Sequence, residues 1–137
     1  MPIIMKRLHF LISIFLFLAT SVSASDWMKS IPDNVYLSQL SLPGTHDSGT
    51  GNGINPSFLA AFAQCQDIPL NEQWSAGIRA FDLRPCVKDD YININHGITA
   101  TNLRFDDALF LLRDSLKAHP SEFAFVHYHY DNDFNKD

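Results

Sequence analysis

The chain has 137 residues, of which 46% are hydrophobic and 18% charged, an ordinary composition for one globular domain. Fifteen acidic residues against ten basic ones give a net charge of −5. Because the sequence has no basic stripe, we do not expect it to bind nucleic acid, and charge alone should not hold it on an anionic membrane.

Residues 1–24 predict a cleaved secretory signal. Lys6 and Arg7 precede the apolar run LHFLISIFLFLAT, and Val22 and Ala24 lie where a signal peptidase requires small residues. The apolar run is shorter than the roughly 20 residues of a membrane span, so an uncleaved anchor is the weaker alternative. The expected location is secreted or periplasmic.

Residues 25–137 are expected to form one domain. No repeat or low-complexity tract interrupts them, and without the two basic residues of the signal their net charge is about −7. Cys65 and Cys86 are too few for a fold built on disulfides, although an exported protein could join them in one bridge. Their separation cannot be read from the sequence, so this bridge stays an open alternative.

The first half of this domain predicts a strand, a helix and a second strand. Residues 35–43, VYLSQLSLP, have the pattern of a strand. Residues 69–77, PLNEQWSAG, predict a short helix that ends at Gly77. Residues 78–84, IRAFDLR, form a short apolar run between a glycine and a proline, which is typical of a strand.

The second half predicts a strand, a long helix and a last strand. Residues 91–97, YININHG, alternate isoleucine with asparagine as a strand does. Asn102 is expected to cap a helix over 103–119, whose apolar residues recur at helical spacing and which Pro120 stops. Residues 122–130, EFAFVHYHY, are aromatic and β-branched and predict a strand.

This order of elements predicts a parallel α/β architecture. A complete βα barrel takes roughly 250 residues, and the predicted domain has fewer than half of that. We therefore expect either a small open α/β sheet or the front part of something larger.

Charged and imidazole side chains gather at the ends of the predicted strands. His46 and Asp47 follow the first, in SLPGTHDSGT, while Asp82 and Arg84 end the second and His96 ends the third. The carboxyl ends of parallel strands form the site face of βα folds, so this clustering suggests a common site. The two-residue period of a strand also puts Asp82 and Arg84 on one face.

Two histidines and an arginine suit phosphoryl transfer. One imidazole can take a proton from an attacking hydroxyl while the other gives one to the leaving oxygen. A guanidinium offers paired donors to phosphate oxygens that gain charge, and a carboxylate can fix an imidazole's tautomer. From these residues alone, turn polarity with a structural ion pair is the alternative.

A family resemblance favours the catalytic interpretation. The chain contains, in this order, SLPGTHDSGT, GIRAFDLRP, NINHG and FLLRDSLKAHPSE. Together, at matching separations, they resemble the catalytic X-region of bacterial phosphatidylinositol-specific phospholipase C. The resemblance spans roughly residues 36–130. It implies an α/β fold, the N-terminal portion of a distorted TIM-type (β/α) barrel that is apparently truncated, because the family's remaining strands are missing.

The resemblance also implies a role for each residue. His46 is expected to deprotonate the inositol 2-hydroxyl, which attacks phosphorus, and His96 to protonate the departing diacylglycerol oxygen. Arg84 would stabilise the phosphorane between them. Asp47 matches the carboxylate that works with the acid histidine, and Asp82 the one that supports the arginine. The products would be diacylglycerol and inositol 1,2-cyclic phosphate.

The family further implies a reaction without a metal or other cofactor. Its calcium-dependent eukaryotic relatives carry a carboxylate where Arg84 stands, and a guanidinium replaces an ion's charge rather than binding the ion. The expected partners are phosphatidylinositol or a glycosylated phosphatidylinositol and, transiently, a membrane surface. Phe58, Phe62 and Trp74 could dock on that membrane or belong to the core.

The last predicted strand departs from the family, which has a basic and an acidic residue against the inositol ring there. This chain offers His127 and His129, which share one face of the strand. They are expected to bind the headgroup. Zinc ligation and an ordinary aromatic strand end are the alternatives, and the sequence places no third zinc ligand clearly.

Three functions follow, in order of support. The first is a secreted phosphatidylinositol-type phosphodiesterase, formally a lyase, or the N-terminal portion of one. The second is a catalytically silent module that binds inositol headgroups or phospholipid surfaces. The third is a metal-dependent glycerophosphodiesterase, for which the sequence lacks the carboxylate-rich metal cluster.

Overall fold

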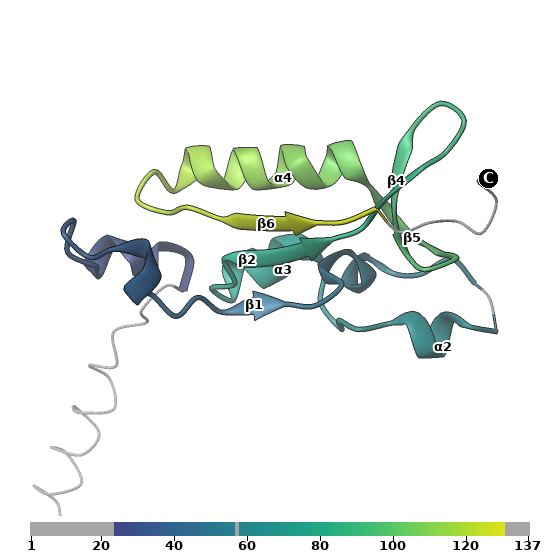
Figure 1. Cartoon of the computed structure of the whole chain (residues 1–137), viewed down its shortest axis with the longest axis horizontal. Coiled ribbons are helices and arrows are strands. Elements are labelled where there is room, and N and C mark those ends of the chain that lie inside the picture. The colour runs from purple at the N-terminus through teal and green to yellow at the C-terminus, as the bar shows by residue number, and fades with distance from the viewer. Residues whose placement is uncertain (1–23, 57, 131–137) are drawn as a thin grey trace, which may run out of the picture.

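A computed structural model describes residues 24–56 and 58–130 (Figure 1). In these ranges the strands form a parallel sheet of order β1-β2-β6 and an antiparallel sheet of order β3-β4-β5. The strands are β1 (Gly44–Thr45), β2 (Ala80–Leu83), β3 (Pro85–Val87), β4 (Ile92–His96), β5 (Thr99–Arg104) and β6 (Phe125–Tyr128). The helices are η1 (Ala24–Ser30), η2 (Leu37–Gln39), η3 (Ser48–Asn52), α2 (Ala60–Ala63), α3 (Leu70–Ser75) and α4 (Phe105–Ala118).

The predicted secretory signal, apart from Ala24, lies outside the described residues. Within the two described ranges, no helix combines the length and the apolar character that a bilayer crossing requires.

The parallel sheet confirms the predicted α/β class. Gly44 pairs with Ala80, and a Cβ on Gly44 would lie 3.0 Å from the Ala80 Cβ, so the missing side chain permits the close approach of β1 to β2. Asp82 on β2 is in register with His127 on β6. Burial alternates along β2, so Ala80 and Asp82 point away from the face that packs in the core.

The predicted strand at 35–43 is wrong. η2 occupies Leu37–Gln39, with Tyr36 N–H donating to the Gln39 side chain at 2.9 Å, and Tyr36 and Leu37 are exposed. Sheet contacts start only at Pro43, whose carbonyl accepts from the N–H groups of Arg79 and Ala80. The apolar spacing of this segment therefore does not reflect a buried strand face.

The antiparallel sheet was not predicted, and His96 therefore ends a strand that is not part of the parallel sheet. β3 and β4 are joined by a short turn closed by Lys88 N–H to the Tyr91 carbonyl at 2.8 Å. So short a connection permits only antiparallel pairing, because a parallel crossover needs a dozen or more residues. Asn102 lies inside β5 rather than capping α4, whose N-cap is Arg104.

The core lies between the parallel sheet and the helices. Phe81 and Leu83 of β2 are 1% and 0% exposed and belong to the same cluster as residues of α3 and α4. Figure 1 shows α4 running alongside β6. The cluster of buried residues consists of Leu70, Trp74, Phe81, Leu83, Ile94, Leu103, Ala108 and Leu112. The two predicted helices are confirmed as α3 and α4, with shorter bounds.

A buried ion pair closes the amino-terminal end of the parallel sheet. Arg79 Nε donates to Glu122 Oε2 at 2.8 Å, and both side chains are fully buried. The other arginine nitrogens donate to carbonyls, including that of Ser25 at 2.7 Å, and the Trp74 ring lies 3.8 Å from the guanidinium carbon. Arg79 thus joins η1 to β2 and to the start of β6.

The suggested disulfide is absent. Cys65 is exposed and Cys86 is buried in β3, and both are free thiols.

Candidate active site

The turn after β1 places Asp47 beneath the site. Asp47 is 2% exposed and has φ 46° and ψ 53°, the one positive φ among described residues other than glycine. This left-handed conformation is tolerated by aspartate and asparagine better than by most residues. Thr50 Oγ1 donates to the Asp47 carbonyl at 2.8 Å, and Asp47 N–H donates to Asp82 Oδ2 at 3.2 Å.

The carboxylate of Asp47 connects the two histidines and the arginine that the sequence singles out. Its Oδ1 lies 2.7 Å from Nε of Arg84. Its Oδ2 lies 3.1 Å from Nε2 of His46 and 3.3 Å from Nε2 of His96. Arg84 and His96, from two other parts of the sequence, therefore meet His46 at one buried carboxylate.

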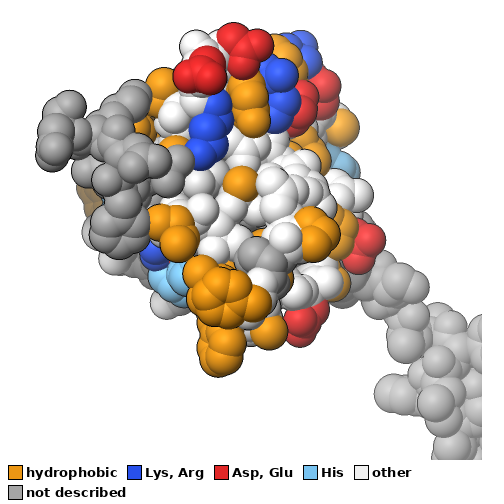
Figure 2. Space-filling model, turned by 90° about the vertical axis from the view of Figure 1, so that its right-hand side faces the viewer, with side chains coloured by type: hydrophobic (Ala, Val, Ile, Leu, Met, Phe, Trp, Pro, Cys, Tyr) orange, Lys and Arg blue, Asp and Glu red, His pale blue; other side chains and the backbone are white. Residues whose placement is uncertain are grey.

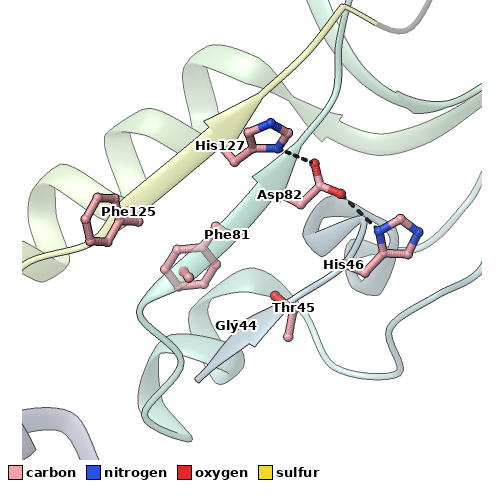
Figure 3. A pocket seen from close by; sticks show the side chains of 8 residues that line it. Gly44, Thr45, His46, Phe81, Asp82, Phe125 and His127 are labelled. Atoms are coloured by element: carbon pink, nitrogen blue, oxygen red, sulfur yellow. Dashed lines mark hydrogen bonds and ion pairs between the residues drawn. The ribbon is translucent and has the colours of Figure 1, made fainter. Parts of the chain in front are cut away.

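The carboxylate of Asp82 is a second point of contact for these side chains, beside Asp47. Its Oδ2 lies 3.1 Å from Nδ1 of His46 and 3.3 Å from Nη2 of Arg84. Its Oδ1 lies 3.4 Å from Nδ1 of His127. Figure 3 shows His127, Asp82 and His46 in a row across the strand ends.

The antiparallel pairing of β3 with β4 brings His96 to the site from the other sheet. The chain leaves β2 through Arg84 and returns along β4, where Asn95 N–H donates to the Arg84 carbonyl at 2.9 Å. His96 follows directly. The antiparallel hairpin therefore brings the second histidine to the carboxyl end of the parallel sheet, a different route to the proximity that the sequence suggested.

The pKa values of Asp47 and Asp82 are shifted in opposite directions. Burial raises the pKa of Asp47, although Arg84, His96 and His46 act to lower it. Burial also acts to raise the pKa of Asp82, but the Asp47 N–H, Arg84 and His127 together hold it below the ordinary value. Asp82 is therefore the more readily ionised of the pair.

A pocket of about 340 Å³ opens beside these residues (Figure 3). Its lining includes His46, Asp82 and His127, together with Gly44 and Ala80. Gly44 has no side chain and Ala80 only a methyl group, so neither fills the pocket. The pocket is lined by Gly44, Thr45, His46, Ala80, Phe81, Asp82, Phe125 and His127.

His127 and His129 lie side by side, as the strand spacing predicts. Their ring centroids are 5.9 Å apart, and both residues are exposed. His129 lies just beyond the end of β6. The structure thus puts both histidines at the same strand end as Asp82.

Two residues beside the site were not predicted. Gln66 Nε2 donates to the His46 carbonyl at 2.7 Å, and Cys65 Sγ lies 3.9 Å from Asp47 Oδ2. Burial, and then the Asp47 charge, raise the pKa of the Cys65 thiol. Their backbone N–H groups both donate to Thr50 Oγ1 at 3.1 Å, which fixes the segment against the turn. Nothing in the local sequence pattern marks them.

The structure shows which of the three aromatic residues that the sequence could not assign are on the surface and which is in the core. Phe58 and Phe62 are 87% and 82% exposed near α2, whereas Trp74 is 3% exposed and belongs to the core. Figure 2, which faces the α2 end of the molecule, shows hydrophobic side chains projecting along its lower edge.

Comparison with curated proteins finds relatives of one kind. No protein-family model matches the chain. The 1-phosphatidylinositol phosphodiesterase of Listeria monocytogenes is 38% identical over 103 residues, which cover 74% of this chain and 32% of that protein. PI-PLC X domain-containing protein 2 of mouse is 29% identical over 140 residues, covering 82% of this chain and 41% of the relative.

Comparison with solved structures agrees. The phosphatidylinositol-specific phospholipase C of Staphylococcus aureus matches with a TM-score of 0.73 and 27% identity, covering 80% of this chain and 36% of that one. The corresponding enzyme of Listeria monocytogenes matches with a TM-score of 0.70 and 31% identity over 83% of this chain and 41% of that one. The chain spans about a third of the length of the bacterial relatives, and the resemblance seen in the sequence is confirmed over most of the chain.

Proposed function

Because the chain is related over most of its length to the phosphatidylinositol-specific phospholipase C family, we propose that it cleaves phosphatidylinositol-type lipids. The products are diacylglycerol and inositol 1,2-cyclic phosphate. The observation that carries this proposal is the convergence of His46, His96 and Arg84 on the buried carboxylate of Asp47.

The two histidines divide the proton transfers. His46 takes the proton of the inositol 2-hydroxyl as that oxygen forms a bond to phosphorus. The bond from phosphorus to the glycerol oxygen breaks, and His96 gives its proton to that oxygen. Asp47 lies 3.3 Å from Nε2 of His96 and so stabilises the protonated ring before the transfer.

His46 has to change one contact before it can act as a base. Its Nε2 faces Asp47 and its Nδ1 faces Asp82, each at 3.1 Å. The substrate hydroxyl must replace one of these carboxylates as the partner of a ring nitrogen. The His46 side chain is 64% exposed, which leaves space for this rearrangement.

Arg84 supplies the positive charge that the phosphate requires. Its side chain is held by Asp47 and Asp82 and is 16% exposed, so its position is set before substrate binds. A fixed guanidinium stabilises charge that develops on the phosphoryl oxygens, because little reorganisation is needed during the reaction. We therefore propose a reaction that needs no metal.

His127 is proposed to contact the inositol ring from the pocket wall, with His129 beside it. The substrate is phosphatidylinositol or its glycosylated form, reached during a transient contact with a membrane. The three parallel strands are proposed to be part of a TIM-type barrel sheet, of which the described residues form one segment.

A silent headgroup-binding module is the second candidate. The observation that favours it is that both ring nitrogens of His46 already face carboxylates at 3.1 Å, so neither is open to a substrate hydroxyl. Such a module would retain affinity for inositol phosphates without turnover.

Export is also part of the proposal. The predicted cleavage after Ala24 leaves Ser25 first, and the packed contacts include Arg79 to the Ser25 carbonyl and Trp27 to the Gly77 carbonyl at 3.0 Å. The intact mass of the protein recovered outside the cytoplasm tests this boundary. A mass that still includes residues 1–24 would contradict cleavage.

The test of function is ³¹P NMR of phosphatidylinositol vesicles incubated with the protein and a chelator. The wild type should release the cyclic phosphodiester, while His46→Ala and His96→Ala should not. His119→Ala is the matched control, because His119 pairs with Asp26 and lies outside the candidate site. Headgroup binding without product in the wild type would favour the silent module instead.

A further inference from the structure

We propose that Asp82, His127 and His129 form a binding site for Zn²⁺ or a cation of similar ligand preference. This site goes beyond the proposed reaction, which uses no metal. It also gives the two histidines the third partner that the sequence did not reveal.

The strand register creates the cluster. Asp82 on β2 and His127 on β6 are paired residues of neighbouring parallel strands, so their side chains leave the same face of the sheet. His129 follows two positions later, with its ring 5.9 Å from that of His127. One donor atom from each of the three residues lies within 4.8 Å of the others.

These distances suit a small divalent cation. Zinc binds imidazole nitrogen and carboxylate oxygen at about 2.0–2.2 Å, so tetrahedral ligands lie roughly 3.3 Å apart. Asp82 Oδ1 and His127 Nδ1 are already 3.4 Å apart. The ligand atom of His129 lies within 4.8 Å of the other two, so a small movement of this exposed side chain would complete the set.

The donor types select the ion. Two imidazoles with one carboxylate match zinc sites that keep a fourth position for water or another ligand. Calcium and magnesium prefer sets of oxygen ligands, so they should bind more weakly here. An anionic oxygen from a ligand in the pocket could occupy the fourth position.

The two oxygens of Asp82 allow this site to coexist with the candidate active site. Oδ2 faces His46 and Arg84, whereas Oδ1 faces His127. A cation on Oδ1 therefore leaves the Oδ2 contacts in place. The side chain of Asp82 is 16% exposed, so the cation can enter from solvent.

A second group of possible ligands, His46, Asp47 and Cys65, fits a cation less well. Asp47 is buried there with the Arg84 guanidinium 2.7 Å from one oxygen. A cation would have to bind close to that positive charge. In the group that contains Asp82, the Arg84 guanidinium contacts Oδ2, at the longer distance of 3.3 Å. The oxygen proposed to bind the cation, Oδ1, faces His127.

The test is isothermal titration of the protein with ZnCl₂ without lipid, with Co²⁺ absorption as an independent probe of nitrogen ligands. His127→Ala and His129→Ala should each weaken zinc binding on the order of tenfold or more and remove the Co²⁺ visible bands. His119→Ala should bind as the wild type does. Circular dichroism should show that each variant is folded.

Zinc binding that is unchanged in both His127→Ala and His129→Ala would overturn the proposal, as would a wild type that does not bind zinc. A stoichiometry of one, lost in both variants, supports it. The measurement involves no turnover, so its outcome does not depend on whether the proposed phosphodiesterase activity is correct.

Discussion

Oδ1 of Asp47 lies 2.7 Å from Nε of Arg84, and this contact forms the buried centre of the candidate site. The other oxygen of the same carboxylate faces both histidines. Asp47 therefore holds three groups in place with one negative charge.

Replacing Asp47 should separate its charge from its backbone role. Asp47→Asn keeps a residue that tolerates the left-handed conformation, so we expect it to be more stable than Asp47→Ala, with a fall in kcat of about 10²–10⁴. Asp47→Ala should add roughly 1–2 kcal/mol of destabilisation, because alanine is strained at this φ.

Lipid turnover and thermal unfolding measure the two effects. Asp114→Asn on α4, an exposed carboxylate, is the control that should change neither. Equal stabilities of the Asn and Ala variants would contradict the backbone argument, and normal turnover in the Asn variant would contradict the charge argument.

Arg84→Lys should reduce kcat by about 10²–10³ while affecting KM less. Lysine keeps the charge but lacks the planar pair of donors, so it cannot hold Asp47 and Asp82 and a phosphate oxygen with the same geometry. Steady-state kinetics test this, with Arg104→Lys, at an exposed arginine, as control. An unchanged kcat for Arg84→Lys would contradict the role given to the planar guanidinium.

Asp82 should contribute stability that depends on pH. Its pKa in the folded protein lies below 3.8, because the contacts of the ionised form outweigh burial. A carboxylate with a lowered pKa stabilises the fold at pH values above its unfolded pKa and loses that contribution as the pH falls through the folded value.

Asp82→Asn should therefore be less stable than the wild type near neutral pH, and the difference should shrink as the pH falls below 3.8. Urea unfolding across this pH range measures it. A difference that is constant or that grows toward acid would mean that the carboxylate is not stabilised as described.

Glu122→Ala should destabilise the fold by about 3–5 kcal/mol, because it leaves the Arg79 guanidinium buried without its ion-pair partner. The same variant also removes Glu122 Oε1, which accepts a hydrogen bond from the Met28 N–H at 2.9 Å. Chemical unfolding of this variant and of Glu72→Ala, whose residue is exposed on α3, provides the comparison. If both variants lose a similar free energy of unfolding, the buried Arg79–Glu122 pair contributes little to stability.

The sequence predicted correctly those elements in which the spacing of the apolar residues matches the buried face. β2 and α4 have apolar residues at strand and helix periods, and both occur close to the expected positions. The strand at 35–43 failed because its apolar residues at positions 36 and 37 are exposed, so their spacing carried no information about a buried face. β5 was missed because the polar run at 99–104 has no apolar alternation strong enough to indicate a strand.

The candidate site was predictable by residue type but not by connectivity. His46, Asp47, Asp82, Arg84 and His96 converge, although His96 arrives on an antiparallel hairpin instead of a parallel strand. The β3–β4 pairing, and the hydrogen bond from Asn95 N–H to the Arg84 carbonyl that continues it, have no sequence signature. Nor does the register that pairs Asp82 with His127, since register depends on tertiary contacts.

The most direct test of convergence on one phosphorus atom compares two leaving groups. Inositol 1-(4-nitrophenyl phosphate) releases 4-nitrophenolate, a stable anion that needs no proton to leave, whereas the diacylglycerol oxygen does need one. His96→Ala should lose about 10²–10⁴ in kcat on the lipid but much less on the nitrophenyl ester, while His46→Ala should lose activity on both. If both variants are impaired equally on both substrates, or neither is impaired, the assignment of base and acid to these two histidines is wrong.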